Sequence, residues 1–408
     1  MKLKKKTHVV ILGAGISGLT VSYFLNQHKI SNTIIEKDKV AGGLLKSFKI
    51  KDFVFDNFIH ISHAKNSVVK NFFKKSSSYF KLKPKPNNLY KDTWIDHSPQ
   101  FHLYPLKLGE KIKIIYSFLT RKKNKGYRIK NYENWLKGAY GDYFAKNFPM
   151  KYTEKYWATK SRNLSTSWIK FRMQEISFWD LLKGSFVKIF RDTYYSSDMK
   201  YPKSGGYESF LKILKKNKNI IFNSKLNFID HTKKKIYLGK KIIKYTNLVS
   251  TIPLPEFSNL SKEKNKKLKF HANKLRCTAG IIISIGLNVD INTRTWFYIY
   301  NKDFKASRIY APKKLSKNNC PKGKSSLQAE IFLDNKKKVD DKYLKFVKNN
   351  TVDNLIKYKI IKKKNIEFID IKYKKYANVI FDKNYDTSRD FIINYFKKLN
   401  VDFVGRFG

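Results

Sequence analysis

The sequence predicts a mixed α/β fold, in which a parallel β-α-β unit opens the chain and antiparallel strands follow in its second half. Residues 8–36 contain a short apolar strand, a glycine-rich turn, a helical pattern and a second apolar strand. Residues 275–332 alternate in the manner of strands, at 279–287, 296–300, 308–310 and 327–332. Residues 131–148 have helical spacing instead. The chain is therefore expected to be α/β at its start and α+β overall.

The first apolar run, residues 8–12, is followed by Gly13, Gly15 and Gly18 in the pattern G-x-G-x-x-G. Gly13 allows a tight turn, Gly15 allows backbone N–H groups to approach a pyrophosphate, and Gly18 allows the helix to pack closely on the strand. The N-terminus of that helix supplies positive potential for phosphates. This order of elements is the fingerprint of a Rossmann-type dinucleotide-binding domain.

The second strand, residues 33–35, ends on Glu36. A carboxylate at this point can accept both ribose hydroxyls and disfavours a 2′-phosphate, so NADP is not expected. Six residues later, Gly42 and Gly43 indicate a second close approach of the backbone to an extended ligand. FAD is long enough to need such an approach, whereas NAD usually is not.

At these residues the chain resembles the FAD-binding superfamily of amine oxidases, protoporphyrinogen oxidases and UDP-galactopyranose mutases, and most of all the mutase-like sugar-pathway flavoproteins. The resemblance implies a Rossmann-type FAD-binding domain with an inserted helical region and an antiparallel-sheet substrate domain. By this resemblance, residues 1–75, 200–260 and 396–408 form the FAD-binding domain, residues 76–199 form a mostly helical substrate region, and residues 261–395 form the antiparallel-sheet domain.

Two later segments resemble pieces of the family's flavin domain. Residues 201–207, YPKSGGY, resemble a Y-P-x-x-G-G segment that precedes a helix, which places that helix at 210–214. Residues 247–253 resemble a strand ending in T-x-P beside the cofactor, after short strands at 219–222 and 226–229 and a hairpin at 236–245. The resemblance also implies that the backbone of Leu226 contacts the adenine.

Residues 55–63, FDNFIHISH, resemble a mutase stretch of glycine-x-His-Ile-x-His that lies next to the flavin. His60 and His63 match it, whereas Phe58 stands where the family has glycine. The resemblance implies that neutral histidines there hydrogen-bond the flavin and tune its redox state. Without the resemblance, a lone histidine is more often a satisfied core or surface residue.

Residues 152–157, YTEKYW, resemble the Y-T-x-K-x-W segment of the mutases. The resemblance implies substrate contacts by Tyr152, Lys155, Trp157 and Arg172, with the tryptophan stacked on a nucleotide base. Spacing alone would make Trp157 a core aromatic residue. Arg308, in S-R-I-Y, resembles an arginine that binds a diphosphate.

Glu330 falls in the same stretch as Arg308, where a surface carboxylate at a strand end and a functional role both fit. Near the end of the sequence, Arg406 matches the family's strand that ends in G-R-x-G and returns to the flavin. In the family, a helix whose N-terminus points at the flavin and pyrophosphate follows. Because the sequence stops at Gly408, the expectation is a fragment or weakened FAD binding.

The charge is far from zero: 86 Lys and Arg against 31 Asp and Glu give +55. Such a balance fits an anionic partner, namely nucleic acid, a membrane surface or a phosphorylated substrate, and it also fits compositional drift towards Lys. The Lys runs are dispersed, so no specific nucleic acid is expected. A peripheral contact with an anionic membrane surface stays open.

Several other classes are disfavoured by the sequence. Cys277 and Cys320 stand alone, which argues against a disulfide framework and a structural zinc site and fits a reducing cytoplasm. No apolar run approaches the roughly 18 residues of a membrane helix. We find no Ser-His-Asp order and no Walker motif, and no metal is expected.

The leading hypothesis is a cytoplasmic FAD-dependent enzyme that acts on a nucleotide-linked sugar in cell-surface polysaccharide biosynthesis. One alternative is an oxidoreductase of the amine-oxidase or protoporphyrinogen-oxidase type, which abstracts hydride from a C–N or C–C bond. The other is a non-catalytic basic binding protein on a decayed flavoprotein scaffold. The first alternative differs from the leading hypothesis in net redox change, and the second in flavin content.

Overall fold

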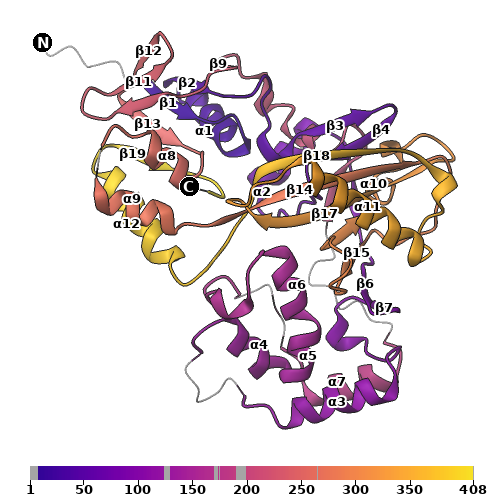
Figure 1. The fold of residues 1–408 in the computed structure, drawn as a ribbon. Helices are drawn as coiled ribbons and strands as arrows, with labels where there is room; N and C mark the ends of the chain where they lie inside the picture. The colour runs from indigo at the N-terminus through magenta and orange to yellow at the C-terminus, as the bar shows by residue number, and fades with distance from the viewer. Residues whose placement is uncertain are drawn as a thin grey trace, which may run out of the picture.

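The computed structural model describes residues 8–123, 129–169, 173, 175–189, 199–263 and 265–407. Its first sheet is parallel and holds the glycine-rich turn. Its order is β19-β13-β1-β2-β9, all parallel. The strands are β1 (His8–Leu12), β2 (Ser31–Ile35), β9 (Ile220–Ile221), β13 (Asn247–Ser250) and β19 (Val401–Phe403). Strands from the start, middle and end of the sequence thus meet in one sheet (Figure 1).

Helices cover both faces of this parallel sheet, which is why β1 is an almost continuous apolar run. On one face, Val9 and Ile11 pack with Leu19 of α1 (Ile16–Gln27). On the other, Val10 and Leu12 pack against α8 (Leu254–Leu260), α9 (Lys266–Lys274) and α12 (Tyr385–Lys397). The sheet is therefore buried between two helical layers.

Smaller elements surround it. An antiparallel sheet contains β10 (Phe228–Asp230), β11 (Lys235–Leu238) and β12 (Lys241–Lys244). A hairpin joins β3 (Ser47–Ile50) to β4 (Phe53–Asp56), and β5 (Tyr79–Leu82) pairs with β8 (Met199–Pro202) near α2 (Ser67–Ser76).

The helix expected at 210–214 is wrong. Two 3₁₀ turns, Tyr207–Leu211 and Leu214–Lys216, stand there, and β10 begins after Leu226. Leu211 ends the first turn and Leu214 begins the second, and both enter the core beside α1.

The second large sheet is mixed and has the order β18-β14-β17-β16-β15-β6-β7. All neighbours are antiparallel except β15 and β6. Its strands are β6 (Asn87–Tyr90), β7 (Thr93–Asp96), β14 (Cys277–Leu287), β15 (Trp296–Ile299), β16 (Arg308–Tyr310), β17 (Ser325–Asp334) and β18 (Ile366–Val379). The strands expected within 275–332 are thus present, while β6, β7 and β18 join them from elsewhere.

The two faces of this sheet differ in chemistry because side chains alternate along each strand. Ile281, Ile283 and Ile285 of β14 pack with α11 (Asp341–Lys357) on one face. On the opposite face, β17 carries Gln328 and Glu330, both without solvent exposure. The apolar face stabilises the sheet, and the polar face is available for a site.

A helical lobe lies beyond the polar face (Figure 1). It contains α3 (Leu108–Leu119), α4 (Tyr132–Tyr140), α5 (Asp142–Asn147), α6 (Pro149–Tyr156) and α7 (Phe178–Phe186); the short α10 (Pro312–Leu315) belongs to the sheet region. The core of the helical lobe is rich in aromatic rings, including Tyr140, Phe144 and Phe148. In the described ranges, no helix is long and apolar enough to span a membrane.

Two helical glycines of this lobe predict opposite effects of the same substitution. A Cβ on Gly184 would lie 2.3 Å from the backbone oxygen of Phe101, whereas a Cβ on Gly109 would meet nothing within 4 Å. Gly184→Ala is expected to destabilise the protein by about 1–3 kcal/mol through overpacking. Gly109→Ala should be neutral or stabilising by up to about 1 kcal/mol, since Ala favours helix. Urea unfolding of both variants measures this; equal midpoints would contradict the packing of α7 on Phe101.

Candidate functional site

The glycine-rich loop adopts the close packing that its motif requires. Gly13 has a φ of 98°, in the region that favours glycine, and its N–H donates to the Ile35 oxygen at 2.8 Å. A Cβ on Gly18 would lie 1.9 Å from the Gly13 oxygen. The turn and the first contact of α1 with β1 therefore depend on these two glycines.

The N-terminus of α1 is open towards a ligand. Gly15 is its N-cap residue and no side chain caps the helix, so its first N–H groups have no side-chain acceptor. A Cβ on Gly15 would meet nothing within 4 Å, so space adjoins these N–H groups. Uncapped N–H groups beside open space are the donor set that a phosphate uses.

Glu36 is held in place from both sides. Its Oε2 accepts from the Ala14 N–H at 2.7 Å and its Oε1 from the Asp38 N–H at 2.9 Å. The Ser224 N–H donates to the Glu36 backbone oxygen at 2.9 Å, which brings the segment of Leu226 alongside. Each carboxylate oxygen keeps a further lone pair for a ribose hydroxyl.

The second glycine pair lies directly on the first loop. The Gly42 N–H donates to the Ala14 oxygen at 2.8 Å, and a Cβ on Gly43 would lie 3.1 Å from the Gly15 Cα. Both residues have positive φ, 127° and 56°. The two glycine motifs thus form one cradle, which a side chain at Gly43 would narrow.

The last described residues also come to this cradle. A Cβ on Gly405 would lie 2.7 Å from Ser17 Oγ, in the first turn of α1. The next residue, Arg406, donates from Nη1 to the Ala377 oxygen of β18 at 3.0 Å. Arg406 therefore links the dinucleotide loop to the seven-stranded sheet.

The segment of His60 and His63, residues 55–63, adopts a left-handed backbone conformation at Phe58, where the family has glycine. Phe58 has a φ of 67°, in the left-handed region that favours glycine, and its ring stacks on Phe332 with centroids 5.5 Å apart. His60 Nδ1 lies 3.2 Å from the Phe58 oxygen. The stacking on Phe332 offsets the strain of this conformation.

His60 and His63 lie in different environments. Burial lowers the pKa of His60 to about 3, and the charges of Arg406 and Arg308 add to this effect. His63 is exposed, and partial burial and then the charge of Lys200 lower its pKa. His60 is thus the histidine of this segment that adjoins both arginines.

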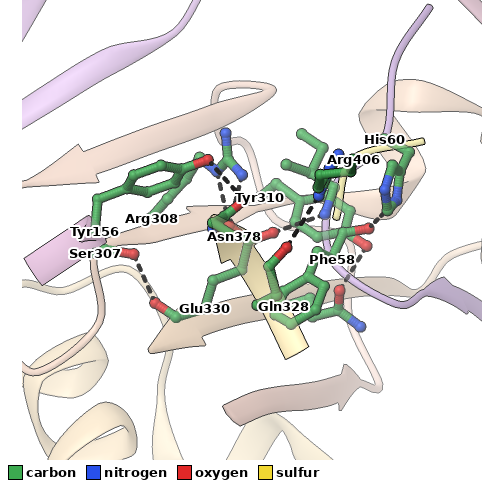
Figure 2. A network of polar contacts seen from close by, with 12 residues as sticks. Phe58, His60, Tyr156, Ser307, Arg308, Tyr310, Gln328, Glu330, Asn378 and Arg406 are labelled. Atoms are coloured by element: carbon green, nitrogen blue, oxygen red, sulfur yellow. Dashed lines mark hydrogen bonds and ion pairs between the residues drawn. The ribbon is translucent and has the colours of Figure 1, made fainter. Parts of the chain in front are cut away.

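A fully buried carboxylate joins this segment to β16. Glu330 Oε2 accepts from Arg308 Nε at 2.9 Å and from its Nη2 at 2.6 Å, while Oε1 accepts from the Ile59 N–H at 2.7 Å (Figure 2). Of the two possibilities that the sequence left open for Glu330, the surface carboxylate at a strand end is excluded, because pairing with β14 and β16 places Glu330 inside.

An aromatic pocket of about 290 Å³ lies between the helical lobe and the polar sheet face. Arg308 lines it, and its Nη1 is the guanidinium donor that takes no part in the pair with Glu330. Tyr156 donates from its hydroxyl to Asn378 Oδ1 at 3.5 Å, on the side of Ala377 and Arg406 (Figure 2). The aromatic lining includes Tyr140, Phe144, Tyr152, Tyr156, Trp157 and Tyr298.

The structure separates the members of the Y-T-x-K-x-W segment. Tyr152 and Trp157 line the pocket, although Trp157 is also packed among Tyr156, Trp168 and Phe381. Lys155 donates from Nζ to the oxygens of Phe304 and Ala306 at 2.5 and 3.0 Å, and burial lowers its pKa to about 7. Lys155 therefore ties α6 to the loop before β16, while Arg172 lies outside the described residues.

Sequence reasoning missed further residues of the site. His97 lines the pocket, and burial, followed by the charge of His102, lowers its pKa to about 3. Gln328 accepts from the Tyr310 hydroxyl at 2.7 Å and donates to Ser284 Oγ at 3.0 Å. For Gln328, a polar residue at an alternate position of an apolar strand was the available signal, whereas His97 follows the end of β7 and carries no such pattern.

The segment 201–207 is fixed by another buried carboxylate. Asp56 accepts from Ser47 Oγ at 2.6 Å, from the Tyr201 hydroxyl at 2.8 Å and from the Tyr207 N–H at 2.9 Å. Burial raises the pKa of Asp56 to about 6.

Across the part of the chain that the structure describes, no three His, Cys, Asp or Glu side chains could hold a metal.

The comparisons with known proteins agree with this geometry. The family model of the NAD(P)-binding Rossmann-like domain matches residues 11–76. A search of curated proteins gave no match. A crystal structure of reduced UDP-galactopyranose mutase is similar with a TM-score of 0.90 and 18% identity, covering 98% of this chain and 90% of the mutase.

Two oxidases are also similar in structure. A putative protoporphyrinogen oxidase from Exiguobacterium sp. 255-15 has a TM-score of 0.76 and 13% identity, with 98% of this chain and 94% of the oxidase covered. A redesigned putrescine oxidase has a TM-score of 0.64 and 10% identity, with 97% and 93% covered. The fold class and the structural resemblance expected from the sequence are therefore confirmed at the level of the fold.

The pKa of His60 leads to a pH prediction. Because the folded protein keeps His60 neutral down to about pH 3, whereas an unfolded histidine binds a proton below 6.5, His60 lowers stability progressively as the pH falls from 6.5 towards 3. The imidazole should remain neutral over pH 5–8. Arg406→Gln removes a nearby positive charge and should raise the pKa of His60. Histidine NMR titration, with His60→Gln to assign the resonance, tests this; protonation near pH 6.5 would contradict it.

Proposed function

We propose that this chain is an FAD-dependent enzyme that acts on a nucleotide-linked sugar in cell-surface polysaccharide biosynthesis, as a mutase-like isomerase. One observation carries the proposal: the dinucleotide cradle and the aromatic pocket are joined by a continuous path of contacts. The path runs from Ser17 through Gly405 and Arg406 to Ala377, and from the adjacent Asn378 to Tyr156 at the pocket. A ligand that spans cradle and pocket edge would bring a reactive ring to the substrate.

The residues of the cradle fit FAD. Glu36 would accept the ribose hydroxyls, and the N–H groups at the start of α1 beside Gly15 would bind the pyrophosphate. Gly42 and Gly43 would allow the extended ligand to pass close to the backbone. A bound FAD supplies the redox-active ring that no side chain provides.

Near the flavin ring of a bound FAD, side chains of this protein would set the local charge and hydrogen bonding. Arg406 would place positive charge at this end of the site. The neutral His60 donates from Nδ1 to the Phe58 oxygen and so keeps Nε2 as a hydrogen-bond acceptor. Phe58 and Phe332 stack beside the same segment and exclude water from it. These residues orient and desolvate the reacting groups.

The aromatic pocket suits a base and a sugar diphosphate. Tyr152, Tyr156 and Trp157 present flat apolar surfaces for stacking, and the hydroxyl groups of the two tyrosines can bind sugar oxygens. Arg308 would bind a diphosphate oxygen through Nη1, while Glu330 keeps its guanidinium in a fixed plane. The likeness to UDP-galactopyranose mutase supports this substrate class.

A second candidate function is oxidation by an amine-oxidase or protoporphyrinogen-oxidase type of flavoenzyme. The observation that favours it is the pairing of Arg308 with Glu330, which leaves the pair without net charge and so weakens the attraction for a diphosphate. An uncharged substrate would fit the aromatic lining equally well. Anaerobic bleaching of the flavin by the substrate would favour oxidation, whereas a mutase substrate leaves the net redox state unchanged.

Gly15 provides a sharp test of FAD binding. Its Cβ would enter open space, so Gly15→Ala should leave the unfolding temperature unchanged. The added methyl would occupy space beside the N–H groups of α1 and should weaken FAD binding at least about tenfold, because the pyrophosphate could no longer approach the backbone. Fluorescence titration of the apoprotein with FAD measures the affinity.

Gly109→Ala is the matched control, since its Cβ also meets nothing within 4 Å but lies on α3 in the helical lobe. It should bind FAD as the native chain does. Unchanged affinity in Gly15→Ala would contradict the assignment of the cradle. A native chain that binds no FAD would instead favour the non-catalytic binding protein on this scaffold.

The substrate is tested with UDP-galactopyranose and dithionite-reduced, FAD-loaded protein. Chromatography of the nucleotide sugars should show conversion to the ring-contracted isomer, and none without the reductant. Arg308→Lys keeps a positive charge opposite Glu330 but loses the fork, so the Michaelis constant should rise about tenfold or more. No isomer from the native reduced protein would exclude the mutase version.

A further inference from the structure

Helix α3 exposes an apolar stripe on the side that is not in the core. Ile114 and Phe118 face inward, into the lobe. On another side, Leu108, Ile112, Tyr116 and Leu119 recur every three or four residues and are between 55% and 68% exposed. This spacing forms a continuous stripe along the helix. A soluble surface helix would place polar residues there.

Helix α7 continues this apolar surface. Trp179 is 74% exposed and Phe186 is 52% exposed, and their separation of seven positions, about two helical turns, places both on one side of the helix. The Nζ of Lys111, on α3, lies 5.5 Å from the centre of the Phe186 ring. The two helices lie together at the outer end of the helical lobe, the lower end in Figure 1. We call these six side chains and their helices the α3–α7 face.

The charge around the α3–α7 face is positive. Residues 107–123 and 175–189 contain eight Lys and Arg and three acids. Of the acids, Glu110 pairs with Lys91 and accepts from the Tyr143 hydroxyl at 2.7 Å, and Asp180 accepts from Ser177 Oγ at 2.9 Å in the cap of α7. Lys107, Lys113 and Lys183 are exposed beside the apolar stripe.

We propose that the α3–α7 face binds the surface of an anionic lipid bilayer, with α3 and α7 lying in the plane of the interface. Leucine, isoleucine and aromatic side chains would enter the boundary between headgroups and acyl chains, while the surrounding lysines contact anionic headgroups. The function is distinct from the proposed flavin chemistry, because none of the six side chains lines the aromatic pocket.

The charge favours a bilayer over a second copy of this chain. A symmetric dimer through this face would bring the lysines of both copies together, in chains that each carry +55. An anionic bilayer instead supplies opposite charge over a wide flat area. The face occupies the end of a lobe, so a planar surface can reach both helices at once (Figure 1).

The test is sedimentation of the full chain with vesicles of phosphatidylglycerol and of phosphatidylcholine. Binding is expected to the phosphatidylglycerol vesicles and to fall as salt is raised, since the headgroup contacts are screened. The variant Ile112→Ser/Trp179→Ser should partition about tenfold or more weakly, because two apolar side chains no longer enter the interface. Both residues are exposed, so the unfolding temperature should not change.

The matched control is Phe270→Ser/Phe346→Ser, which removes two aromatic side chains that are 57% and 49% exposed on α9 and α11. It should bind vesicles as the native chain does. Equal binding by Ile112→Ser/Trp179→Ser would show that general positive charge alone attracts the protein, and would overturn the proposal. So would a concentration-dependent dimer in sedimentation velocity that this variant abolishes, or the absence of binding to phosphatidylglycerol.

Discussion

The site depends on one buried carboxylate, that of Glu330. An ionised group without solvent exposure persists only when its lone pairs are satisfied and its charge is balanced. Glu330 meets both needs by accepting from two nitrogens of Arg308 and from the Ile59 N–H. These donors belong to β16 and to the histidine segment, which are far apart in the sequence. A requirement of burial therefore fixes the relative position of the pocket arginine and His60.

The sheet that carries Glu330 separates stability from chemistry by its alternation. The apolar side chains of β14 and β17 that pack on α11 supply the burial that stabilises the sheet. The opposite face can then hold polar groups, provided that each finds a partner. Gln328 meets this condition through Tyr310 and Ser284. Such a bonded layer is rigid, so the pocket beyond it has a preorganised floor.

Local physics explains what the sequence could predict. The loop of Gly13, Gly15 and Gly18 is specified by neighbouring residues, and so is the alternation of β14 to β17. The remaining features depend on contacts between distant segments. The burial of Glu330 follows from the pairing of β17 with β14. The 3₁₀ turns after Gly206 belong to a core that they share with α1. The role of Lys155 depends on the carbonyl groups of Phe304 and Ala306, which lie about 150 positions later in the sequence. No local pattern distinguishes these outcomes from their alternatives.

The net charge and the pocket have separate physical origins. Among the described residues that line the aromatic pocket, Arg308 is the one cation, and Glu330 balances it. The lysines lie elsewhere because a buried ammonium must be paired or lose its proton, as the lowered pKa of Lys155 shows. The +55 therefore acts at the surface, over distances of about a Debye length, and hardly at the substrate. Recognition inside the pocket must depend on aromatic stacking and on the donors that Arg308 retains, whereas attraction to anionic surfaces depends on the dispersed lysines.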